Sequence, residues 1–254
     1  MWAGQYSFVL RNLVEKDFKV RYRNMSLGIF WSLLNPLIMM AVLTFVFTQI
    51  FSNSSGTNYP ISVLCALVPL SFFQIAWVSG TCSLQENAAL IKKVPVPRQI
   101  FPIASVLSNC LHLIIQIGLL LGAVLVFGRG INRYWLWLPV IWALEIFFVL
   151  GLTLVFSALN VYVRDMRYVV ESANTVLFWL VPVFYSFSLI PDRFHEIYQL
   201  NPVAAVVLMV RTVLLEGKPP LFHTLGLLTI VSLSMLAAGL VVFRRLTKGF
   251  YEHL

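Results

Sequence analysis

The sequence predicts an all-α membrane protein with six transmembrane helices. Three observations lead to this fold class: the composition, six long apolar runs, and the distribution of positive charge. Hydrophobic residues make up 59% of the 254 residues and charged residues only 11%, about half the charged fraction of soluble domains. We therefore expect a single transmembrane domain, 1–254, with short loops and no separate soluble domain.

The first 27 residues predict a cytoplasmic interface helix. Residues 2–23 carry apolar and charged side chains at a spacing of four, and Arg11/Glu15 and Glu15/Lys19 are i,i+4 pairs of opposite charge. Such a helix lies in the membrane interface. It either anchors the chain or docks a cytoplasmic partner, and both roles stay open. The segment lacks the early apolar core of a cleavable signal peptide.

Six apolar runs of about 20 residues, the length that a bilayer requires, follow along the chain. Five predicted spans occupy 28–190 and the last lies in 221–254. The runs are Ile29–Phe51, Pro60–Cys82, Ile103–Phe127, Tyr134–Asn160, Tyr168–Ile190 and Leu221–Phe243.

The stretch Gln85–Pro102 fixes the predicted orientation. It combines three prolines, which interrupt helices, with Lys92, Lys93 and Arg98. Six spans place both termini on one side, and most of the 18 Lys and Arg residues then lie on that side. The positive-inside rule makes this side cytoplasmic.

Residues 191–220 form the predicted outer segment. Within it, Pro202–Leu215 is apolar but too short to cross comfortably, which favours a re-entrant or interfacial helix. Asn201-Pro202 predicts its start and Glu216-Gly217 its end. The helix either shapes an exit vestibule or lies passively on the outer surface.

Ionisable residues at membrane depth are candidate functional residues. Glu145 lies about 16 Å into the fourth predicted span, and His112 about 14 Å into the third. His112 also belongs to a polar stripe with Asn109 and Gln116. We expect His112 and Glu145 to meet as an intramembrane polar pair, either as structural contact or as part of a transport route.

Several functions are disfavoured. The net charge of +8 comes from scattered basic residues rather than one basic face, so nucleic-acid binding is not expected. The three cysteines have neither CxxC spacing nor an even count, so no metal site or disulfide framework is predicted. No nucleophile–base pair is recognisable. The chain also lacks the P-loop pattern for binding ATP phosphates, so we expect no cofactor in this chain.

Four stretches carry a family resemblance: Lys16–Leu37, Glu86–Pro102, Leu159–Val170 and Tyr198–Val207. With six spans between them, the chain resembles the permease subunits of type-2 ABC exporters that move lipid-linked polysaccharides such as O-antigen or teichoic acid. The resemblance implies a homodimer in the bacterial cytoplasmic (inner) membrane. It also implies two cytoplasmic ATPase subunits, which bind ATP and Mg²⁺, and a polyprenyl-linked glycan as cargo.

The resemblance assigns expected roles to three sets of residues. Those expected to couple to the ATPase are Arg11, Glu15, Lys19, Glu86, Lys92, Lys93 and Arg98. Those expected at substrate access and the cytoplasmic gate are Leu27, Gly28, Arg164, Asp165 and Arg167, of which Arg164 and Arg167 could instead only set the topology. Two polar and aromatic stripes, chosen because sugars offer hydroxyls and apolar faces, are expected to line the channel: Trp31, Asn35, Met39, Asn174, Phe178 and Tyr185. Packing or lipid contact is the alternative role for these stripes.

Two alternative functions stay open. The first is a type-2 ABC exporter of a drug or small lipid, which would have a closed apolar path. The second is a membrane-embedded lipid-sugar transferase, which would need paired carboxylates or basic residues at one interface with Mg²⁺ or a sugar phosphate.

Overall fold

A computed structural model describes residues 2–23, 26, 28–50, 59–93, 96–127, 130–185, 191, 193, 198 and 200–252. Every element of regular secondary structure in these ranges is helical. Five helical segments are long and apolar enough to cross a membrane. They are Gly28–Ile50, Tyr59–Glu86, Ile100–Val126, Arg133–Tyr162 and Phe222–Leu246.

The first of these segments consists of a short 3-10 turn (Gly28–Phe30), α2 (Trp31–Phe45) and a π turn (Val46–Ile50). The next two are α3 (Tyr59–Glu86) and α5 (Ile100–Val126). The fourth joins a 3-10 turn, Arg133–Trp137, to α6 (Leu138–Tyr162), and the fifth is α10 (Phe222–Leu246). These bounds confirm five of the predicted spans to within a few residues, and α10 continues into a 3-10 turn, Thr247–Glu252.

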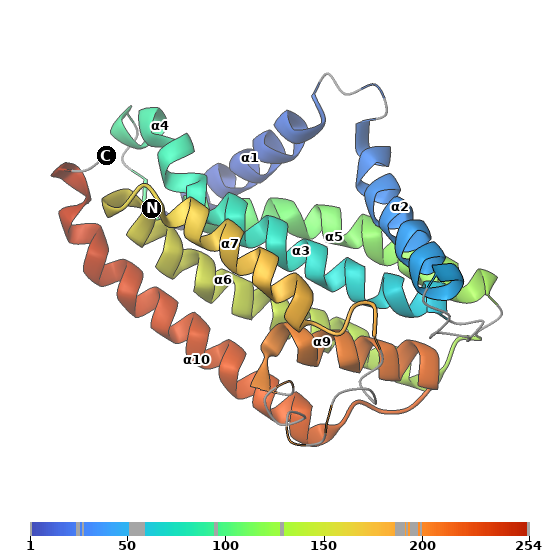
Figure 1. Ribbon diagram of the computed structural model, residues 1–254. Coiled ribbons are helices and arrows are strands. Elements are labelled where there is room, and N and C mark those ends of the chain that lie inside the picture. The colour runs from blue at the N-terminus through green and yellow to red at the C-terminus, as the bar shows by residue number, and fades with distance from the viewer. Residues whose placement is uncertain are drawn as a thin grey trace.

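Helix α3 is the centre of the bundle, in contact with α2, α5, α6, α7 and α9 (Figure 1). Its sequence is apolar all round, as expected of a helix that is buried on most sides. Helix α10 packs along α6, where Gly151 and Gly239 bring the two backbones together. Small residues at such positions allow helices in membranes to approach closely.

The predicted fifth span is shorter than expected. Helix α7 covers only Met166–Leu180, about 22 Å at the usual helical rise, and Val181 already has extended geometry. Pro182 accounts for this end, because a proline disfavours helical geometry in the residue before it. The chain continues through buried, non-helical residues 181–183 to Tyr185, and residues 186–190 of the predicted span lie outside the described part.

The proline-rich turn is shorter than predicted. Helix α3 extends to Glu86, a short helix α4 (Ala88–Lys93) follows, and α5 begins at Ile100. Pro102 therefore lies in the first turn of α5 rather than before it. A proline is tolerated there, because the first backbone N–H groups of a helix have no partner within the helix.

The short apolar helix before the last span is present at the predicted position. Helix α9 covers Pro202–Arg211 and continues as a π turn, Thr212–Glu216. The Asn201 side chain caps its start by accepting from the backbone of Val203 and Ala204, and Gly217 ends it with a φ of 62°. The helix is mostly buried against α3, α6 and α10.

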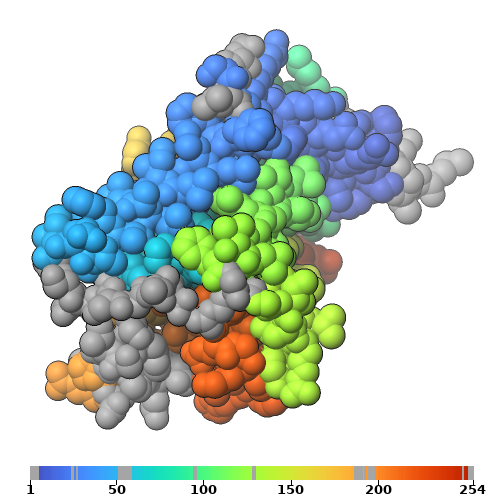
Figure 2. Space-filling view, turned by 90° about the vertical axis from the view of Figure 1, so that its right-hand side faces the viewer, coloured from blue at the N-terminus to red at the C-terminus, as the bar shows by residue number. Residues whose placement is uncertain are grey.

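The N-terminal helix α1 (Trp2–Tyr22) lies across α5 rather than parallel to the bundle (Figure 1). In the space-filling view, α1 and α2 lie beside α5 on one face of the molecule (Figure 2). The start of α1, helix α4 and the end of α10 lie at the same end of the bundle (Figure 1).

Candidate functional site

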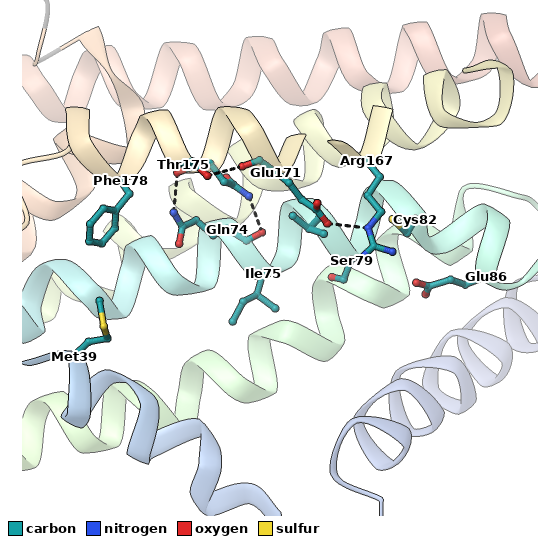
Figure 3. Close-up of a pocket in the computed structure, with 12 residues that line it drawn as sticks. Met39, Gln74, Ile75, Ser79, Cys82, Glu86, Arg167, Glu171, Thr175 and Phe178 are labelled. Atoms are coloured by element: carbon teal, nitrogen blue, oxygen red, sulfur yellow. Dashed lines mark hydrogen bonds and ion pairs between the residues drawn. The ribbon is translucent and has the colours of Figure 1, made fainter. Parts of the chain in front are cut away.

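A groove of about 730 Å³ runs between α2, α3 and α7 and is the candidate functional site (Figure 3). Three of its lining residues, Met39, Asn174 and Phe178, are predicted channel residues, and two more are the predicted gate residue Arg167 and the predicted coupling residue Glu86. Its other lining residues are Gln74, Ile75, Val78, Ser79, Cys82, Glu171 and Thr175. We call it the α2–α3–α7 groove.

One end of the α2–α3–α7 groove is charged. Arg167 Nε lies 2.8 Å from Glu171 Oε1, one turn along α7, while Glu86 and Cys82 come from the end of α3. The arginine and glutamate side chains are 57% and 41% exposed, so the pair orients the guanidinium and contributes little stability. This end of the groove can therefore receive a charged or strongly polar group.

In the middle of the groove, two side chains join α3 to α7 by hydrogen bonds. Gln74 Nε2 donates to the backbone oxygen of Asn174 at 3.0 Å, and Asn174 Nδ2 donates to that of Gln74 at 3.2 Å. Asn174 is only 7% exposed, and its Oδ1 has no hydrogen-bond partner in the described part of the chain. Because a buried unpaired acceptor is costly, this oxygen is an unsatisfied polar atom beside the groove.

The other end of the groove is apolar and aromatic. Met39 and Phe178 face each other there (Figure 3). Phe178 packs against Trp179 and Phe184, with ring centroids 5.7 and 6.3 Å apart. Aromatic faces of this kind can stack on apolar surfaces of a ligand.

The remaining predicted channel residues lie outside the groove. Trp31 and Asn35 are exposed on α2. The Tyr185 hydroxyl donates to backbone oxygens at the end of α7 and lies 3.1 Å from the Tyr198 hydroxyl. The structure therefore gives Tyr185 a packing contact beyond the groove.

Two of the other predicted gate residues lie at the surface. Arg164 and Asp165 are exposed in the turn between α6 and α7, and Gly28 has a φ of 50° that favours glycine. Leu27 lies outside the described residues.

The predicted coupling residues divide into two groups. On α1, Glu15 pairs with Arg11 at 3.0 Å and with Lys19 at 3.4 Å, which confirms the predicted pairs. Lys92 and Lys93 are exposed at the end of α4. Arg98 is directed inward: it donates to the backbone oxygen of Thr247 at 3.1 Å and lies 5.5 Å from the ring centre of Phe250. Its contacts join the α4–α5 turn to the C-terminal segment.

The predicted His112–Glu145 pair was wrong. The His112 ring is hydrogen-bonded to the Tyr22 hydroxyl at 2.7 Å, and neither Glu145 oxygen has a partner in the described part of the chain. The His112 side chain contacts α1 instead of Glu145 on α6.

Sequence reasoning missed the α3 wall of the groove and the inward contacts of the half-buried Arg211. Gln74 and Ser79 lie in an otherwise apolar run, and their polarity at membrane depth was the available signal. Arg211 lies in the predicted outer segment, 191–220, and donates to the backbone oxygens of Ser62 at 3.0 Å and Val183 at 2.7 Å. Arg211 thereby holds α9 against α3 and the segment after α7.

The fold and the groove define a helical, multi-pass membrane protein with a groove along its central helix that is charged at one end and apolar at the other. The sequence profile of the ABC-2 type transporter family matches residues 9–215, so the chain belongs to this family. It is 29% identical over 243 residues to the O-antigen export system permease protein RfbA of Klebsiella pneumoniae, covering 95% of this chain and 93% of that protein.

Two further relatives also match nearly full length. The O-antigen export system permease protein RfbA of Myxococcus xanthus is 28% identical over 252 residues, which are 98% of this chain and 96% of that protein. The polysialic acid transport protein KpsM of Escherichia coli is 22% identical over 238 residues, 91% of each chain.

Proposed function

We propose that this chain is the permease subunit of an ATP-driven exporter that moves a lipid-linked polysaccharide, of the O-antigen or teichoic acid type, out of the cytoplasm. Full-length similarity to O-antigen export permeases supports the class of transporter. The observation that carries the proposal is the α2–α3–α7 groove.

The composition of the α2–α3–α7 groove suits a glycan. Sugar rings present hydroxyls together with apolar C–H faces. The unpaired Asn174 Oδ1 accepts a hydroxyl, and Phe178 supplies a stacking surface at the other end. Arg167, at the charged end, supplies a cation for the phosphate of a polyprenyl-linked glycan that arrives from the cytoplasmic leaflet.

In this proposal the chain crosses the bacterial cytoplasmic membrane six times, with both termini inside. Helix α7 and the non-helical residues 181–185, of which 181–183 are buried, together make the fifth crossing, since non-helical backbone is tolerated at membrane depth where protein covers it. Helix α9 and Thr212–Glu216 form the re-entrant segment on the outer side. Gly28, Arg164 and Asp165 border the cytoplasmic access.

A second copy of the chain completes the conduit. Helix α2, which forms one wall of the groove, exposes the large apolar side chains Trp31, Ile38, Val42 and Phe45. On α7, Val176 and Trp179 are also exposed. A facing copy covers part of this surface and converts two half-open grooves into one closed path, while membrane lipid covers the rest.

Energy comes from a partner, because the chain has no P-loop. Two cytoplasmic ATPase subunits, which bind ATP and Mg²⁺, act on the exposed charged surfaces of α1 and α4 and the end of α3. Arg11, Glu15, Lys19, Lys92 and Lys93 contact the ATPase, and Glu86 links that surface to the charged end of the groove. The chain itself has no catalytic residue in this proposal.

The test is export in a bacterium whose own O-antigen permease has been deleted. The chain is co-expressed with the ATPase encoded beside it, and surface glycan and ATP hydrolysis are measured. We expect the ATPase to co-purify in equal amount and glycan to reach the surface. An Asn174→Leu variant that still assembles should export less glycan.

Other results would contradict the proposal. A complex that hydrolyses ATP but exports no glycan favours the alternative cargo, a drug or small lipid. A chain that purifies alone and transfers sugar in the presence of Mg²⁺ favours the lipid-sugar transferase, in which Glu86 and Glu171 would supply the paired carboxylates.

A further inference from the structure

The last turn of α1 is fixed to α5 by two polar contacts. Arg21 Nη1 donates to Asn109 Oδ1 at 2.6 Å, and the Tyr22 hydroxyl is hydrogen-bonded to His112 at 2.7 Å. Burial lowers the pKa of Arg21 from its ordinary value of 12.5. A guanidinium remains charged at neutral pH, so its bond to the amide is charge-assisted and strong.

The amide of Asn109 connects this contact to the interior. Asn109 is 1% exposed, and its Nδ2 donates to Ser79 Oγ at 2.9 Å and to the backbone oxygen of Ser105 at 2.8 Å. The Ser105 hydroxyl also lies 3.2 Å from Ser79 Oγ. Both ends of the amide are therefore engaged, one by α1 and the other by α3.

Ser79 is a lining residue of the α2–α3–α7 groove (Figure 3). Consecutive hydrogen bonds thus join Arg21 to Asn109 and Asn109 to Ser79, from helix α1 to the groove wall. Because Asn109 is buried and its partners are fixed, a shift of α1 must either carry the amide with it or break a buried hydrogen bond.

We propose that Arg21, Asn109 and Ser79 form a polar relay through which movement of α1 changes the α3 wall of the groove. The relay rests on the proposed function, in which the ATPase moves α1. Asn109 is then a positioning residue: it touches neither nucleotide nor cargo, and it acts through Ser79.

A second buried amide on the same stripe provides a matched control. Gln116 is 2% exposed and is also bonded at both ends, to the Ser71 hydroxyl at 3.0 Å and to the backbone oxygen of Ser32 at 3.2 Å. These partners belong to α3 and α2, and neither is a lining residue of the groove. Gln116→Leu therefore removes a comparable buried amide without removing the Arg21–Asn109 or Asn109–Ser79 hydrogen bonds.

The experiment uses the complex with its ATPase and the native Cys82, which lines the groove one turn from Ser79. The other two cysteines, Cys65 and Cys110, are replaced by alanine. The rate of Cys82 labelling by a small maleimide is measured with and without a non-hydrolysable ATP analogue. Co-purification of the ATPase is measured for every variant, since a variant that fails to assemble has lost more than the relay.

We expect Asn109→Leu and Arg21→Gln each to reduce the nucleotide-induced change in labelling by about threefold to tenfold. The double variant should be no worse than either single variant, because either change cuts the same path. Arg21→Lys, which keeps the charge, should retain part of the response, and Gln116→Leu should retain all of it.

Three results overturn the relay while leaving the proposed function intact. In the first, the double variant Arg21→Gln/Asn109→Leu loses more of the labelling response than either single variant. In the second, Gln116→Leu loses as much of the response as Asn109→Leu. In the third, nucleotide does not change Cys82 labelling in the wild-type complex. Failure of the ATPase to co-purify with the wild-type chain contradicts the proposed function itself, and the relay with it.

Discussion

The close contact between α6 and α10 predicts a strong effect of a very small substitution. A Cβ atom added at Gly151 would lie 2.5 Å from the backbone carbon of Met235. A Cβ atom added at Gly239 would meet the backbone of Gly151 and would lie 3.0 Å from the Gly151 Cα. Backbone atoms cannot rotate away as a flexible side chain can, so the helices themselves must move apart.

The magnitude follows from the geometry. Carbon atoms pack at about 3.5–4.0 Å, so Gly151→Ala requires a separation of about 1 Å at this point, and a gap of that size forfeits about a quarter to a half of each neighbouring contact. Overpacking of this kind costs about 1–3 kcal/mol. Even the lower value changes the ratio of folded to unfolded chain about fivefold.

The assay is unfolding by SDS in mixed detergent micelles, for Gly151→Ala and Gly239→Ala. Gly226→Ala is the matched control, since it lies on α10 and its added Cβ would meet nothing within 4 Å. We expect both test variants to unfold at lower SDS fractions and the control to be unchanged or slightly stabilised. Equal stability of all three variants would refute the argument.

Three further predictions concern single side chains. Arg211→Lys should lower the thermal unfolding temperature, because lysine cannot reach both backbone oxygens. One carbonyl then loses its partner, which costs about 1–3 kcal/mol. An unchanged unfolding temperature would contradict this. Glu145→Met should leave the SDS unfolding midpoint unchanged or raise it, since the buried carboxyl makes no hydrogen bond in the described structure; a clear loss would reveal a partner. Hydrogen bonds and ion pairs from Arg11 and Lys19 lower the pKa of Glu15 below 4.5, so their stabilisation is present above that pH and lost as pH falls through the folded pKa. An NMR titration of the Glu15 carboxyl that gave a midpoint of 4.5 or higher would contradict this.

Local signals predicted α9 well. Asn201-Pro202 and Glu216-Gly217 act within one turn of the helix ends, and the capping contacts appear where these residues place them. The end of α7 was not predicted, although Pro182 was a signal for it. The predicted span followed the apolar run to Ile190, and hydropathy carries no information on backbone geometry.

The groove could be predicted only in part. Met39, Asn174 and Phe178 belong to polar and aromatic stripes, which indicate one face of their helices. Helix α3 is mostly apolar on all sides, so its sequence does not indicate which face lines the groove. The failed His112–Glu145 pair has a similar cause. Helical periodicity shows which residues of one helix share a face, but the rotation of one helix against another depends on packing that the sequence does not display.

The most direct test of the central claim is to ask whether cargo passes along the α2–α3–α7 groove. A photo-crosslinking phenylalanine analogue is placed at Phe178, or at Phe147, which is 38% exposed on α6 and is not a lining residue of the groove. Cells that make the glycan and the partner ATPase are then irradiated. The account predicts a glycan adduct at Phe178 and none at Phe147; equal adducts at both positions, or adducts at Phe147 alone, would contradict it.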